Sequence, residues 1–211
     1  MKENVLVIST HPDDEALGCG GTILKYKAQN VNVSWLIITE EKQMDLETVS
    51  KRFGFSSVFN LDFLSMELDN EKLSSLIKKV KNVFDQVKPT TIFLPNRTDA
   101  HSDHRVTFNA VMACAKSFRA PYIKKILMYE CISETEFAPA LPENIFIPNY
   151  YIDISAYLKE KISILNIYQS EMGEHPFPRS ERNVEALAIF RGAIAGVEYA
   201  EAFQLIKFID K

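Results

Sequence analysis

The amino-acid sequence predicts an α/β fold in which helices cover both faces of a mostly parallel sheet. Runs rich in β-branched residues recur along the first 130 residues, and segments with helical periodicity separate them. No linker, repeat or low-complexity stretch interrupts this alternation. Strands that alternate with helices form parallel sheets covered on both sides. We therefore expect a Rossmann-like, doubly wound, three-layer architecture.

The strands are expected at apolar runs that end in polar residues, namely residues 5–9, 31–39, 57–61, 90–95 and 125–130. The clearest helix is expected over residues 71–87, where apolar side chains recur every three or four positions. This stripe consists of Leu73, Leu76, Ile77, Val80, Val83, Phe84 and Val87.

The segment after residue 130 is less regular. Pro139, Pro142 and Pro148 precede a short extended piece, YYIDI. A helix is expected from about Ser155 to Ser170, and a last helical region from about Arg182 onward. We expect this part to pack on the same sheet, so that residues 1–211 form a single domain.

Composition narrows the classes of function. The chain has 211 residues, 46% of them hydrophobic, and a net charge of −4, which makes a nucleic-acid partner unfavourable. The first apolar run is too short for a signal peptide or a membrane span. Cys19, Cys114 and Cys131 are odd in number and far apart, so we expect reduced thiols in a cytoplasmic protein.

Two polar clusters follow the first and fourth expected strands: HPDDE at residues 11–15 and NRTDAHSDH at residues 96–104. In the common strand order 3-2-1-4-5, these two strands are neighbours at the point where the order reverses, and ligands of doubly wound sheets bind there. Three of the four histidines lie in the two clusters. We therefore expect the clusters to face each other across one crevice.

His11, Asp14 and His104 can supply two imidazoles and a carboxylate, the ligands of a catalytic zinc ion that keeps its fourth position open. The same ligand set also accepts Fe²⁺ or Co²⁺. Asp13 would remain free as a base toward metal-bound water, whose pKa falls to about 7.

Simpler interpretations exist for single residues. Asp13 or Asp14 could cap the helix that begins near Glu15, and His101 and His104 could be surface loop residues. A glycine-rich dinucleotide site is disfavoured, because acidic residues follow the first strand directly. The glycines, Gly18, Gly20 and Gly21, are expected instead to let the first helix approach the sheet closely.

Taken together, the motifs resemble the PIG-L, or LmbE-like, family of zinc-dependent N-deacetylases over nearly the whole chain. The most specific are HPDDE followed by ALGCGGT, and HSDHR at residues 101–105. The weaker ones follow in the expected order: YE at 129–130, FIPNYYIDIS at 146–155, Y-x-S at 168–170, and RG with GVEYAEAF over 191–203.

The resemblance implies an LmbE-like three-layer fold, with His11, Asp14 and His104 as ligands of one zinc ion. It implies that Asp13 acts as general base and then as acid toward the leaving amine, and that His101 helps to hold the oxyanion. Asp103 would orient a ligand histidine. Family members remove an acetyl group from an N-acetylglucosamine unit attached to a lipid, inositol, malate or another aglycone.

The chain departs from the family pattern after its second strand. Where relatives carry an arginine thought to grip the sugar, counting back from Gly54 gives Lys42, and lysine cannot make the same bidentate contact. His175 and Arg179 lie in a proline-bounded loop. This loop is either plain surface or a lid over an anionic aglycone, in which case both residues and Lys42 would contact substrate.

The leading hypothesis is therefore a zinc-dependent hydrolase that acts on the N-acetyl amide of a small amino-sugar conjugate. A metal-dependent phosphoesterase is the first alternative, and it would require two metal ions. A non-catalytic sugar-binding relative is the second, against which the intact Asp13 argues. The sequence leaves a homo-oligomer open.

Overall fold

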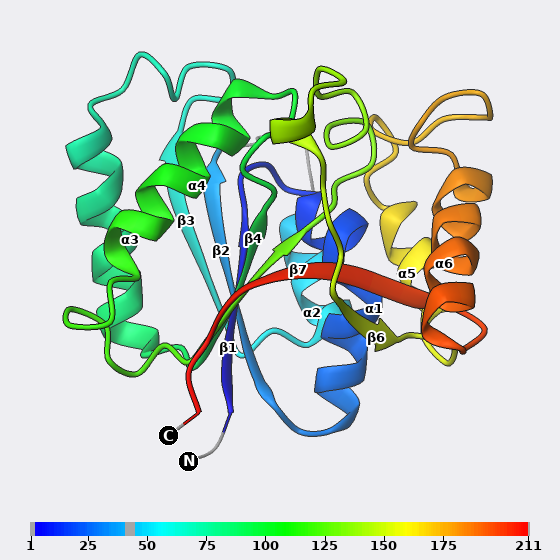
Figure 1. The fold of residues 1–211 in the computed structure, drawn as a ribbon, viewed down its shortest axis with the longest axis horizontal. Coiled ribbons are helices and arrows are strands. Elements are labelled where there is room, and N and C mark those ends of the chain that lie inside the picture. The colour runs from blue at the N-terminus through cyan, green and yellow to red at the C-terminus, as the bar shows by residue number, and fades with distance from the viewer. Residues whose placement is uncertain (1–2, 41–44, 211) are drawn as a thin grey trace.

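A sheet of mainly parallel strands forms the centre of the computed structural model, which describes residues 3–40 and 45–210. Its parallel part has the order β3-β2-β1-β4-β5 (Figure 1). The bounds are β1 (Asn4–Ser9), β2 (Asn32–Thr39), β3 (Ser57–Phe63), β4 (Thr91–Pro95) and β5 (Lys125–Tyr129). The expected fold class and this strand order are confirmed.

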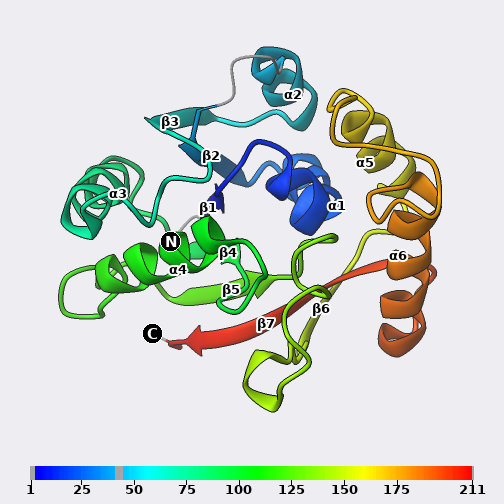
Figure 2. The same ribbon diagram turned by 90° about the horizontal axis from the view of Figure 1, so that it is seen from above.

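Helices pack on both faces of the sheet (Figure 2). One face carries α3 (Leu73–Val87) and α4 (Ser102–Cys114). The other carries α1 (Asp14–Ala28), α2 (Leu46–Phe53), α5 (Leu158–Leu165) and α6 (Glu181–Ala195).

The central strand β1 is apolar at consecutive positions because each of its faces meets a core. Val5 and Val7 point into the core under α1, and Leu6 and Ile8 into the core under α3 and α4. The apolar stripe expected over residues 71–87 faces this second core, where Leu76, Val80, Val83 and Phe84 are buried.

The C-terminal region differs from the expectation. The last helix, α6, ends at Ala195, where Gly196 adopts the left-handed conformation that commonly terminates helices. The chain then returns as β7 (Ala200–Phe208), which lies antiparallel between β5 and β6 (Tyr150–Asp153). The helical region expected from about Arg182 onward is therefore confirmed only as far as Ala195, and the strand that follows it was not predicted.

The helix expected over residues 155–170 is also shorter, because α5 ends at Leu165. Beyond this point Tyr168 is buried, and its hydroxyl donates to Glu15 at 2.5 Å. A short 3₁₀ helix, η1 (Pro142–Asn144), lies in the loop after β5.

The three cysteines are free and buried, as expected for reduced thiols. Among the described residues, none of the helices has the length and apolar character needed to cross a bilayer. The cytoplasmic location stays a prediction.

Candidate active site

The turn from β1 into α1 brings polar side chains to the carboxyl end of the sheet. Asp14 folds back on this turn, and its Oδ2 accepts hydrogen bonds from the Thr10 and His11 amides at 2.8 and 2.9 Å. Asp13 has a φ of 123°, which few non-glycine residues adopt, and makes no side-chain capping bond. The capping interpretation of Asp13 therefore does not fit.

His11, Asp14 and His104 converge, with potential ligand atoms all within 4.8 Å of one another. His11 Nδ1 lies 4.0 Å from Asp14 Oδ2, and His104 Nε2 lies 3.4 Å from Asp14 Oδ1. His11 follows β1, whereas His104 comes from α4 after β4, so two neighbouring strands supply the cluster.

His104 carries the clearest sign that this cluster fits a cation. Its Nδ1 pairs with Asp99 Oδ2 at 2.8 Å, while its Nε2 is buried and finds no hydrogen-bond partner among the described residues. A histidine that binds a metal usually donates a hydrogen bond from one ring nitrogen to a carboxylate, and its other ring nitrogen faces the metal. His104 has this arrangement, with Nε2 directed toward Asp14. Two imidazoles and a carboxylate suit zinc.

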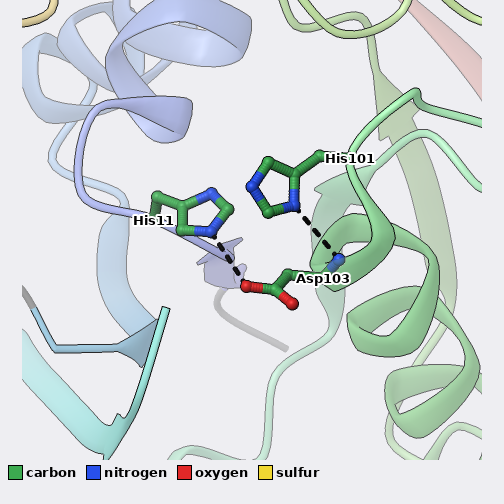
Figure 3. Close-up of side chains that lie close together, drawn as sticks. All are labelled: His11, His101 and Asp103. Atoms are coloured by element: carbon green, nitrogen blue, oxygen red, sulfur yellow. Dashed lines mark hydrogen bonds and ion pairs between the residues drawn. The ribbon is translucent and has the colours of Figure 1, made fainter. Parts of the chain in front are cut away.

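A second group, His11, His101 and Asp103, is also close enough to hold an ion (Figure 3). Three of its polar atoms, however, already have hydrogen-bond partners. Asp103 Oδ2 pairs with His11 Nε2 at 3.3 Å and accepts from the Met66 amide at 2.7 Å, and His101 Nδ1 accepts from the Asp103 amide at 3.1 Å. This group therefore orients His11 and His101. The group of His11, Asp14 and His104 is the better metal site.

The electrostatics of the group formed by His11, Asp14 and His104 favour positive charge. Burial opposes a charge on His104, but Asp14 and Asp99 outweigh it and raise the pKa of His104 to about 10. Burial likewise opposes a charge on Asp14, yet His104 and His11 hold the pKa of that carboxyl well below its ordinary value. The same attraction that stabilises a proton here would stabilise a bound cation.

Asp13 lies beside the cluster and contacts Arg179, whose Nη1 donates to Asp13 Oδ2 at 2.5 Å. Burial raises the pKa of Asp13 well above its ordinary value, the charge of Asp14 adds to this, and the Arg179 guanidinium opposes it. The Asp13 amide donates to Glu15 at 3.1 Å, which fixes the unusual backbone. The arrangement makes Asp13 a stronger base than an exposed carboxylate.

His101 is partly buried, and the centre of its ring lies 4.4 Å from that of His11. Burial and the neighbouring histidines lower its pKa to about 4, so its ring is neutral at pH 7. Because Nδ1 accepts from a backbone amide, the ring proton is assigned to Nε2. His101 can therefore donate a hydrogen bond to a bound oxygen.

A cavity of about 170 Å³ lies against His11, Asp13 and His101. Its walls combine residues of four loops: His11, Pro12, Asp13, Ser65, Met66, His101, Glu171 and Arg179. A larger, more apolar cavity of about 490 Å³ lies between the loop after β5 and α6, and no candidate metal ligand lines it. The chemistry therefore belongs to the smaller cavity.

The remaining candidate residues fall in different places. Lys42 lies outside the described residues. His175 lines a separate cavity, whereas Arg179 reaches the site. Arg179 also contacts Glu171 at 2.9 Å, and its Nε donates to Ser133 at 2.7 Å, so its charge is already balanced.

Some residues of the site were not predicted from the sequence. Asp99 lies in the quoted cluster NRTDAHSDH, and its place five residues before His104 was the available signal. Glu171 and Cys131 gave none, because their contacts are tertiary. Cys131 Sγ lies 3.3 Å from Asp14 Oδ1.

The chain is an α/β protein of LmbE-like architecture with histidine and aspartate side chains gathered where the strand order reverses. Residues 6–115, slightly more than half of the chain, match the family model described as GlcNAc-PI de-N-acetylase, PIG-L. The chain belongs to this family, and the resemblance noted in the sequence is confirmed.

Individual relatives are distant. A diacetylchitobiose deacetylase from Thermococcus kodakarensis is 22% identical over 97% of this chain and 83% of its own length. A conserved protein from Thermus thermophilus has a TM-score of 0.79 at 24% identity, with 99% of this chain and 97% of that one covered. A 4-carboxy-2-hydroxymuconate hydratase from Pseudomonas putida has a TM-score of 0.72 at 15% identity, covering 99% and 98%. Since the fold also occurs in a hydratase, the reaction must be argued from the site.

Proposed function

We propose that the chain is a zinc-dependent hydrolase that removes the N-acetyl group from an N-acetylglucosamine-type amino sugar or its conjugate. The observation that carries this proposal is the convergence of His11, Asp14 and His104, in which the buried Nε2 of His104 faces Asp14 without a hydrogen-bond partner among the described residues. His11 and Asp13 line the adjacent cavity. Membership of a family whose model is described as a de-N-acetylase supports the reaction type.

In this proposal His11, Asp14 and His104 hold one Zn²⁺ per chain, and Fe²⁺ or Co²⁺ would fit the same donors. A bound divalent cation would supply Lewis acidity, which polarises an amide carbonyl and makes water more acidic. Asp99 and Asp103 orient the two ligand histidines through hydrogen bonds.

The protein residues divide the proton transfers between them. The Asp13 carboxylate takes a proton from the attacking water and returns it to the nitrogen of the departing amine. Neutral His101 donates its Nε2 proton as a hydrogen bond to the carbonyl oxygen as negative charge develops there. Arg179 holds the Asp13 carboxylate in place.

Two of the three residues expected to contact substrate are engaged elsewhere in the structure. Arg179 is already paired with Asp13 and Glu171, and His175 lines another cavity. A preference for an anionic aglycone would therefore rest on Lys42. We propose a small amino-sugar conjugate as substrate, a single domain over residues 1–211, and a cytoplasmic location.

The proposal is tested by acetate release from a panel of N-acetylated sugars: free N-acetylglucosamine, conjugates with neutral and anionic aglycones, and a diacetylated disaccharide. We expect acetate from at least one conjugate, loss of activity with a chelator, and recovery with Zn²⁺. Hydrolysis of phosphate esters without acetate release would favour the phosphoesterase instead. Sugar binding without any turnover would favour the non-catalytic relative.

A further inference from the structure

The helix that carries Asp14 is broken in its middle. Cys19 has a φ of −140° and a ψ of 15°, which divides α1 into residues 14–18 and 20–28. The first piece begins with the proposed metal ligand, and the second continues along the sheet beside α5 (Figure 2). The bend at Cys19 therefore fixes the direction of the piece that presents Asp14.

A buried ion pair lies at this break. Glu201 of β7 accepts from the Gly21 and Thr22 amides at 2.8 Å each, one with each carboxylate oxygen. Lys161 of α5 donates from Nζ to the Leu17 carbonyl and to Glu201 Oε1, both at 2.7 Å. The side chains of Lys161 and Glu201 are each only 5% exposed.

The pair replaces a helical hydrogen bond. In an unbroken helix the Gly21 amide would donate to the Leu17 carbonyl four residues earlier. Here the Leu17 carbonyl accepts from Lys161, and the Gly21 amide donates to Glu201. The ion pair is thus inserted between the two groups, and its carboxylate caps the second piece as an acidic residue does at a helix N-terminus.

Stability alone is a weak reason for such a pair, because desolvation offsets much of the attraction between buried charges. Geometry is a stronger one. Five residues of helix span about 7 Å, so a change of about 10° in the bend would move Asp14 by about 1 Å. Metal ligands must be placed to within about 0.2 Å.

We propose that Lys161 and Glu201 are positioning residues for the metal centre, which set the bend of α1 and thereby the place of Asp14. The inference rests on the proposed function only through the metal site. It also assigns a role to the C-terminal motif GVEYAEAF, in which Glu201 lies.

The test measures Co²⁺ affinity and the visible absorption spectrum of bound Co²⁺, which reports ligand geometry. Glu201→Gln keeps the size of the side chain but can accept from only one of the two amides. The double variant Lys161→Met with Glu201→Gln leaves no unpaired buried charge, so it remains usable if the single variant folds poorly. Leu76→Ala, in the core on the opposite face of the sheet, is the control for lost stability.

We expect both Glu201 variants to bind Co²⁺ about 10- to 100-fold more weakly, with an altered spectrum. Leu76→Ala should lower the melting temperature and keep the wild-type affinity and spectrum. Wild-type affinity and spectrum in the folded double variant would overturn the inference and leave the metal site intact. Absence of Co²⁺ binding by the wild-type protein would instead remove the metal site, and the inference with it.

Discussion

Asp13 combines an unusual backbone with an unusual environment. Its φ of 123° costs about 1–3 kcal/mol for a residue with a Cβ. The contacts that hold it are the hydrogen bond from its amide to Glu15 and the ion pair of its carboxylate with Arg179. Strain of this kind is retained where a side chain must point to a defined place, which here is the wall of the 170 Å³ cavity.

Replacing Asp13 separates its roles as base and as structural residue. Asparagine has nearly the same shape and tolerates a positive φ better than most residues, so Asp13→Asn should fold and keep its metal. It cannot take a proton from water, so kcat for acetate release should fall by about 10²- to 10⁴-fold, with a smaller change in KM. Metal content and acetate release are measured on one preparation.

Asp14→Asn serves as the matched variant, since it lies one residue further along the same turn and should lose the metal. Full activity of Asp13→Asn would contradict the assignment of Asp13 as the base. Loss of metal from Asp13→Asn, with metal retained by Asp14→Asn, would mean that the roles of the two aspartates are exchanged.

At the scale of single residues, the sequence was informative where the chemistry is local. His11 and Asp14 come from one turn, and His101, Asp103 and His104 from another, so each set could be recognised within a few positions. The contact between Arg179 and Asp13 joins residues 166 positions apart, and no local pattern encodes it. The contact of Cys131 with Asp14 is of the same kind.

At the scale of elements, the close packing of α1 depends on its glycines, as the sequence indicated. A Cβ on Gly18 would lie 2.2 Å from Cδ2 of the Tyr129 ring, which is buried and whose hydroxyl donates to the Ile8 carbonyl. A Cβ on Gly21 would lie 2.7 Å from Ile154. The helix therefore lies closer to β5 and to the segment after β6 than alanine would allow.

Gly18→Ala tests this packing. Alanine in a helix is intrinsically favoured over glycine by about 0.5–1 kcal/mol. Overpacking against a fixed ring costs about 1–3 kcal/mol, and we expect it to dominate, so urea unfolding should show a net loss of stability. Gly20→Ala should lose less, because a Cβ there would lie 3.0 Å from Lys161 Cγ, a less severe overlap than the 2.2 Å approach of Gly18 to the Tyr129 ring. An unchanged or raised midpoint for Gly18→Ala would contradict the packing argument.

Element by element, the strands were the most predictable part. Both faces of the parallel strands are covered, so they appear as short continuous apolar runs, and each predicted run overlaps a strand. β7 was missed because YAEAFQLIKF follows a helix directly and mixes polar with apolar residues in the way a helical segment also does. Only its pairing with β5 and β6 decides its conformation.

At the scale of the whole molecule, the topology places the site. β1 and β4 are adjacent at the point where the strand order reverses, so the loops that follow them meet although about 90 residues separate them. β7 pairs with β5 and β6 in the part of the sheet beyond β5 and brings Glu201 to the break in α1. The N-terminal and C-terminal thirds of the chain thus meet at one site.

This topology explains why some features of the molecule could be predicted from the sequence and others could not. The order of the parallel strands follows from general rules for alternating strands and helices, and it placed the two histidine clusters together. The return of β7 and the Lys161–Glu201 pair depend on contacts between distant segments. The position of Lys42 falls outside the described residues, so the origin of sugar specificity stays a prediction.

The central claim is that His11, Asp14 and His104 together hold a divalent metal ion. Elemental analysis of purified wild-type protein and of His104→Ala tests it most directly, with circular dichroism to show that both are folded. We predict one divalent ion per wild-type chain and almost none in His104→Ala, since two remaining ligands bind too weakly to keep it. Two ions per wild-type chain, or a folded His104→Ala protein that keeps its metal, would contradict the account.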